Sequence, residues 1–211
     1  IPAGEVSAES VDALRAAGWE VNSTGIAPTF RAGWSLWHSF REFAQNSLDE
    51  VGSVEVEIMR MIDTRGVDRV MTIVADDGAG FAVQSLLLGE RKATTPKDVA
   101  CLRGRFGEGM KIGVLPIVRS GGRIFIRTAG LDVSFIVGET TLAGQRVKAL
   151  LVLTRKGPAT RGTTVAIEGL DATNFEGHDL RVRLAPVLAV VRPGAVLHTV
   201  RGGPGEHDAC K

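Results

Sequence analysis

The sequence predicts an α+β fold, a two-layer sandwich in which a mixed, mostly antiparallel sheet carries helices on one face. Apolar residues recur at three- and four-residue steps over residues 37–51, as in an amphipathic helix. Several other segments alternate apolar with polar residues or form short apolar runs, as strands do. The order is helix, hairpin, loop, helix and then further strands, which favours one layer of helices on one sheet.

Ser7 stands where it can cap a first helix, which Gly18 would end. Residues 19–28 have no clear period and are expected to form an irregular connector. The central helix is expected from about Arg31 to Val51, just before Gly52. Residues 53–58 alternate polar with apolar, a turn follows at 64–66, and residues 70–75 are apolar, which together predict a β-hairpin.

Residues 82–103 show little periodicity and many polar side chains. A short helix is expected after Gly109, and Pro116 should kink or end it. Strands are predicted at 124–128, 131–137, 147–154 and 164–168, and a last helix at 179–191. Residues 201–211 are rich in Gly and Pro and are expected to be flexible. The predicted organisation is therefore an N-terminal helix and connector (1–30), a main domain (31–200) and a tail (201–211).

Composition limits the class of protein. The 211 residues suffice for one domain with a substantial core, and 44% apolar and 23% charged content is ordinary for a globular protein. No apolar run approaches the roughly 20 residues that span a bilayer, and no basic-then-apolar leader follows Ile1. We therefore expect no membrane association and a cytoplasmic protein with reduced thiols at Cys101 and Cys210. The net charge of +1, more basic in the second half, permits contact with nucleic acid without arguing for it.

The polar face of the central helix carries the first candidate site. Glu42 and Asn46 are one turn apart and point the same way. An amide oxygen can ligate a hard cation such as Mg²⁺, and a carboxylate can take a proton from an attacking water. The alternative is a polar face that only meets solvent.

A second candidate follows the second strand of the hairpin. Asp76 ends that strand, so its carboxylate is held in place and can accept a hydrogen bond from an exocyclic amine such as that of adenine. Gly78 and Gly80 let the backbone bend tightly and let a flat base approach. An ordinary Asp-Gly turn is the alternative.

A third candidate precedes the short helix. Gly104, Gly107 and Gly109 suit a loop whose amides face an anion at the helix N-terminus, and Lys111 adds a positive charge. A flexible surface loop is the alternative here.

Taken together and in this order, the three motifs resemble the GHKL superfamily of ATPases. It joins type II topoisomerases, large heat-shock chaperones, histidine kinases and MutL-type mismatch-repair proteins. The stretch Arg161–Ile167 looks like the late Gly-Thr strand of that family, so the resemblance covers residues 30–170. It implies the Bergerat ATP-binding fold. Residues 45–49, 93–97 and 162–165 look most like the MutL branch and residues 104–109 like the chaperone branch, so the branch is left open.

The resemblance implies a role for each motif residue. Glu42 would be the general base, and Asn46 would hold Mg²⁺. Asp76 would bind the adenine amine of ATP, with Gly78 and Gly80 shaping the base pocket and Thr163 supporting it. The loop and helix residues around the phosphates would be Gly107, Gly109, Met110 and Lys111. Residues 82–103 would form a lid that closes over the nucleotide.

The resemblance also implies partners and a limit on rate. Family members commonly dimerise when ATP closes the lid, and a protein or DNA partner is left unidentified. MutL-type proteins and topoisomerases use a second domain to bring a lysine to the γ-phosphate, so we expect slow hydrolysis by this chain alone. The alternative function is a degenerate binding or structural protein that keeps the fold without turning over ATP.

Overall fold

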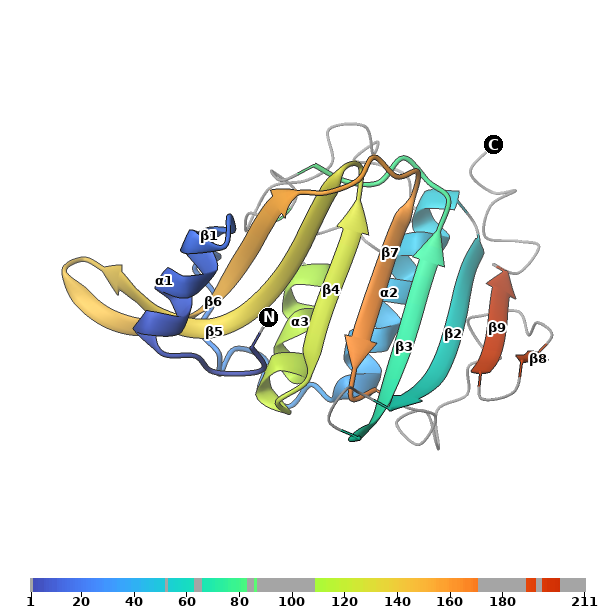
Figure 1. The fold of residues 1–211 in the computed structure, drawn as a ribbon, viewed down its shortest axis with the longest axis horizontal. Coiled ribbons are helices and arrows are strands. Elements are labelled where there is room, and N and C mark those ends of the chain that lie inside the picture. Colours follow the sequence, from blue (N-terminus) through green and yellow to red (C-terminus); the bar gives the residue numbers. More distant parts are fainter. Residues whose placement is uncertain are drawn as a thin grey trace.

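The computed structural model describes residues 2–51, 53–62, 66–82, 86, 109–170, 189–192 and 195–201. This part of the chain forms three helices and one nine-stranded sheet (Figure 1). The helices are α1 (Ala8–Ala16), α2 (Leu36–Val51) and α3 (Gly109–Arg119). The strands are β1 (Glu20–Ser23), β2 (Ser53–Ile62), β3 (Asp68–Asp76), β4 (Arg123–Thr128), β5 (Leu131–Leu142), β6 (Gln145–Lys156), β7 (Thr163–Glu168), β8 (Ala189–Arg192) and β9 (Ala195–Arg201).

The sheet has the order β1-β6-β5-β4-β7-β3-β2-β9-β8, and every pair of neighbouring strands is antiparallel. The α+β class is confirmed. Between described strands the sheet is not mixed, because the parallel contact is an isolated bridge from Glu5 to Val137. None of the described helices is both long and apolar enough to cross a membrane.

Helices α2 and α3 cover one face of the sheet, behind it in Figure 1, and the larger core lies between them and the strands. Phe40, Phe43 and Ala44 of α2 are buried there. In β4, every second residue is buried, so that Ile124 and Ile126 point into this core. The alternation places one side of the central strands under the helices and leaves the other side facing away from them.

The expectation that the helices share one face is wrong for α1, which lies in front of the sheet in Figure 1. Val11 and Leu14 of α1 pack with Trp19 in a second apolar cluster. Strands β5 and β6 supply the rest of this cluster, namely Ile136, Ala149, Leu151 and Leu153. These two strands are apolar on both faces, so burying one face under α2 and α3 leaves apolar surface that α1 covers.

The predicted first helix is confirmed, with Ser7 accepting a hydrogen bond from the N–H of Ser10 as its cap. The central helix starts at Leu36 and not at Arg31, because the preceding residues form turns and Arg31 has a φ of +51°. The helix α3 continues past Pro116 to Arg119, so the expectation that Pro116 could end this helix was wrong. Proline removes one helical hydrogen bond, and the fully buried apolar surroundings of this helix hold the segment in place.

Three further elements differ from expectation. The supposed connector contains β1, which pairs with β6 in the same sheet as the main domain. Residues 189–191, predicted as helix, lie in β8, which forms a hairpin with β9. Arg201, placed in the flexible tail, ends β9. The remainder of the predicted last helix and of the tail lies outside the described residues.

Candidate functional site

The carboxylate of Asp76 stands at the end of β3 and is held from three directions. Its Oδ1 accepts hydrogen bonds from the N–H of Gly78 at 3.0 Å and of Thr163 at 3.2 Å. Its Oδ2 accepts a hydrogen bond from the hydroxyl of Ser47, on α2, at 2.7 Å. The three donors come from the following turn, from β7 and from α2. The carboxylate therefore has a fixed position and direction, as a group that reads a ligand needs to have.

Two threonines extend this arrangement along the strand ends. The hydroxyls of Thr163 and Thr128 are 3.0 Å apart, and the Thr128 hydroxyl also accepts a hydrogen bond from the N–H of Phe81 at 3.0 Å. Gly80 passes so close that a β-carbon there would lie 2.6 Å from the Thr128 Oγ1, and its φ is +74°. The turn after β3 therefore needs glycine at this position.

Gly162 is a residue of this site to which the sequence interpretation gave no role. A β-carbon at this position would lie 1.9 Å from the carbonyl oxygen of Asp76, and its φ is +76°. Its N–H donates to the carbonyl of Gly78 at 2.9 Å, which joins the start of β7 to the turn after β3. The Arg-Gly-Thr sequence before a strand was the available signal, but the contact is visible only once the two strands are paired.

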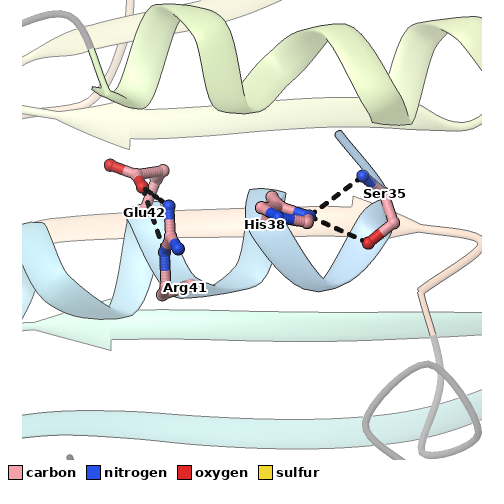
Figure 2. A network of polar contacts seen from close by, with 4 residues as sticks. All are labelled: Ser35, His38, Arg41 and Glu42. Carbon is pink, nitrogen blue, oxygen red and sulfur yellow. Dashed lines mark hydrogen bonds and ion pairs between the residues drawn. The ribbon is translucent and has the colours of Figure 1, made fainter. Parts of the chain in front are cut away.

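Glu42 projects from α2 toward α3 (Figure 2). Its Oε1 accepts hydrogen bonds from the guanidinium of Arg41, the closer at 2.5 Å. Its Oε2 lies against Gly109, where a β-carbon would come within 2.0 Å of it. Gly113, one turn further along α3, also lies against Glu42. A β-carbon at position 113 would be 3.2 Å from the β-carbon and 3.6 Å from the γ-carbon of Glu42. Two glycines thus make room for one carboxylate, 20% exposed, between the helices.

Figure 2 also shows how the start of α2 is fixed. The Nδ1 of His38 contacts both the N–H and the hydroxyl of Ser35, at 3.1 and 3.0 Å. The His38 ring stacks on Trp34 at a centroid distance of 5.4 Å. The guanidinium of Arg41 lies over the same Trp34 ring. His38 therefore holds the first turn of the helix that carries Glu42.

Asn46 lies half-buried on α2, one turn after Glu42 and next to Ser47. A single helix thus places Glu42 at α3 and Ser47 at Asp76, with Asn46 between them in the sequence. Among the described residues there is no group of three or more His, Cys, Asp or Glu side chains that could hold a metal ion.

The remaining predicted residues have different positions. Met110 is half-buried and packs against the larger core. Lys111 is fully buried in α3, so its ammonium does not lie on an open surface. Gly107, with the rest of the glycine loop, lies outside the described residues. Of the predicted lid, the structure describes Ala82, which is exposed, and Leu86, which is buried in the core.

No protein-family model matches this chain, and no curated protein matches it in sequence. The structure itself establishes an α+β protein in which α2, the end of β3 and the start of β7 converge on one fixed carboxylate.

Proposed function

We propose that this protein binds ATP together with Mg²⁺ and hydrolyses it slowly, in the manner of the GHKL ATPases. The supporting observation is the convergence of separated motifs on Asp76, which Ser47 of α2 and Thr163 of β7 hold in place. These residues are 29 and 87 positions from Asp76 in the sequence, so a chance turn at Asp76 does not explain their meeting.

Asp76 is suited to read an amine on a base. An ionised carboxylate only accepts hydrogen bonds, and its two oxygens offer about four lone-pair sites. Three of these are used by Gly78, Thr163 and Ser47. One acceptor site is left for a ligand donor such as the exocyclic amine of adenine. Guanine presents an oxygen at that place, so two acceptors would meet without a proton between them.

Glu42 and Asn46 are suited to the phosphate end of the ligand. The start of α3 has N–H groups without intrahelical partners and a partial positive charge, which favour phosphate. Glu42 points at this helix start, with the glycine at position 109 leaving space for it. Asn46 offers an amide oxygen, a ligand type that Mg²⁺ accepts alongside substrate phosphates. Bound Mg²⁺ would neutralise negative charge that builds up on the phosphate oxygens.

The hydrolytic step requires a proton acceptor, and Glu42 fills that role. Its Oε2 would take a proton from a water molecule as the water oxygen attacks the terminal phosphorus, while the bond from phosphorus to the leaving ADP oxygen breaks. Arg41 holds Oε1 and so fixes the direction of the second oxygen. Lys111, in the first turn of α3, would add a positive charge at the phosphate end. Closure of residues 82–103 would accompany association with a second copy or with a protein or DNA partner.

One observation favours an alternative in which ATP is bound but not turned over. Arg41 pairs with Glu42 at 2.5 Å, so one oxygen of the proposed base is already occupied by a cation. If the guanidinium keeps the carboxylate from the water, the same site is a nucleotide-controlled binding module.

Calorimetric titration with Mg-ATP and Mg-GTP tests the shared part of both functions. ATP should bind about tenfold or more tightly, because a mismatched buried acceptor costs about 1–3 kcal/mol. Saturating Mg-ATP, at roughly a hundred times its dissociation constant, adds about 2.7 kcal/mol and should raise the melting temperature by roughly 5–10 °C.

Asp76→Asn keeps the size of the side chain but replaces an acceptor by a donor, so it should abolish the ATP preference. Asp77→Asn is the matched control, because that neighbouring side chain is 77% exposed. Absence of any shift at millimolar Mg-ATP, or equal affinity for the two nucleotides, contradicts a base-reading Asp76.

A further inference from the structure

The face of the sheet turned away from α2 and α3 contains a hollow of about 380 Å³. This volume is in the range of small-molecule sites. The hollow lies beside Trp19, where the cover provided by α1 ends, and over the central strands β3, β4 and β7. It is lined by Trp19, Met71, Arg123, Ile124, Phe125, Ser134, Arg155, Ala166 and Glu168.

The charged groups of the hollow have a positive balance, with two guanidinium groups against one carboxylate. That carboxylate, Glu168, is shared, because Arg69 pairs with its other oxygen while Arg123 lies 3.3 Å away. The partner of Arg155 is shared in the same way, since Asp132 also binds Arg127. Neither pocket arginine therefore has a carboxylate to itself.

Arg123 carries a more specific indication. Its Nε is buried and has no hydrogen-bond partner in the described part of the chain. A buried donor left without an acceptor costs about 1–3 kcal/mol, and more when the group is charged. The side chain as a whole is 39% exposed, so an anion that enters from solvent can reach the exposed part of its guanidinium. A shift of the side chain toward that anion would also give Nε an acceptor.

Between its charged groups the hollow has apolar surface, provided by Phe125, Met71 and Ala166. Trp19, which is 6% exposed, lies at its edge. The Arg155 guanidinium stacks over the Trp19 ring at 4.3 Å, which holds this cation at the edge of the hollow. Apolar walls of this kind bind the body of a ligand, and the guanidinium of Arg123 can bind its charged group.

We propose that this hollow binds a small organic anion, in which a carboxylate or phosphate group is attached to a flat apolar body. The charged group would bind at the exposed part of the Arg123 guanidinium, and the body would lie along Phe125, Met71 and Ala166 toward Trp19. The site is separate from the nucleotide site, because the sheet lies between the hollow and the helices α2 and α3.

Trp19 makes the test direct, because the chain has three tryptophans and the other two, Trp34 and Trp37, contact the core under α2 and α3. In a Trp34→Phe/Trp37→Phe protein the fluorescence reports on the hollow alone. Phenyl phosphate and benzoate are titrated, with inorganic phosphate as the probe that lacks an apolar body. At least one aromatic anion should give a saturable change, about tenfold or more tighter than inorganic phosphate. The tighter of the two identifies phosphate or carboxylate as the preferred group.

Arg123→Met should weaken binding by about tenfold or more, the worth of a charge-assisted hydrogen bond. Arg146→Met is the control, because that side chain is 84% exposed on the β5–β6 hairpin. Ala166→Leu removes no charge but fills the hollow, so it should block binding in a protein with an unchanged melting temperature. Unsaturable titrations, equal affinity for phenyl phosphate and inorganic phosphate, or full binding by Ala166→Leu overturn the assignment.

Discussion

Gly109, the first residue of α3, lies against the carboxylate of Glu42 so closely that a β-carbon at position 109 would come within 2.0 Å of its Oε2. The carboxylate is the terminal group of a flexible side chain, whereas Gly109 is part of a helix. A methyl group added at 109 would therefore displace the carboxylate and leave the backbone in place.

Gly109→Ala should accordingly reduce ATP turnover by about tenfold to a hundredfold, since misplacement of a catalytic group by about 1 Å has an effect of that size. The melting temperature should not fall, because alanine is the better helix former. The change should have no further effect in a protein that already carries Glu42→Gln. Gly33→Ala is the control, because nothing lies within 4 Å of a β-carbon there. Equal turnover in Gly109→Ala and wild type would show that Glu42 does not act from this position.

Glu42 and Asn46 share a face of α2, but substitutions of the two residues should have different effects on ATP binding and turnover. Glu42→Gln removes the proton acceptor and a negative charge near the phosphates, so Mg-ATP binding should stay intact or tighten while turnover falls by about 10²–10⁴. Calorimetry and single-turnover hydrolysis measure the two effects. Glu139→Gln, on an exposed part of β5, is the control. If Glu42→Gln binds and hydrolyses as wild type does, the base is another group.

Asn46→Ala should weaken binding of Mg-ATP because it removes a cation ligand. The affinity for ATP measured in EDTA should be much less affected, which separates loss of a Mg²⁺ ligand from general damage. Asn22→Ala, at an exposed position of β1, is the control. Equal losses with and without Mg²⁺ would assign Asn46 a structural role.

Thr128→Val should weaken ATP binding and lower stability together. The buried hydroxyl contacts Thr163 and accepts from the N–H of Phe81, so valine leaves that N–H without an acceptor. Such a loss costs about 1–3 kcal/mol, to be measured by urea unfolding and by ATP titration. Thr141→Val, exposed near the end of β5, should do neither. A stable Thr128→Val protein with normal affinity would separate Thr128 from the base end of the site.

Arg119→Met should destabilise the protein by about 1–3 kcal/mol without removing any site residue. The Arg119 guanidinium, at the end of α3, donates to the carbonyls of Pro28, Phe30, Arg31 and Trp34, and so ties that helix to the turns before α2. Urea unfolding gives the change, with Arg146→Met as the exposed control. An unchanged midpoint would mean that these exposed bonds exchange with water at no cost.

Local patterns were sufficient to predict much of the fold. The six strands at 53–58, 70–75, 124–128, 131–137, 147–154 and 164–168 were predicted, because alternation and short apolar runs are properties of the segment itself. β1, β8 and β9 were missed. β1 and β8 have four residues each, and all three are defined by the strands with which they pair. The placement of α1 could not be predicted either, because it depends on which face of β5 and β6 the other helices leave open.

For the site, the sequence proposed Asp76 and Glu42 from residue type, spacing and family resemblance, and it proposed Thr163 as a support for Asp76. It gave no role to Ser47, Thr128 or Gly162. Ser47 and Thr128 act through contacts across 29 and 35 positions, and Gly162 acts by close backbone approach to Asp76, which no local pattern contains. The function, the nucleotide, the domain boundaries and the lid remain predictions.

The position of Ser47 on the same helix as Glu42 gives α2 the role of a spacer of fixed length. Ser47 follows Glu42 by five positions, which is about 7.5 Å along the helix axis. Because Ser47 fixes Asp76 at one end and Glu42 faces α3 at the other, the distance between the two ends is set by a rigid rod and not by loops. If the proposed nucleotide binds here, the site should distinguish nucleoside mono-, di- and triphosphates by how far each extends from a base held at Asp76.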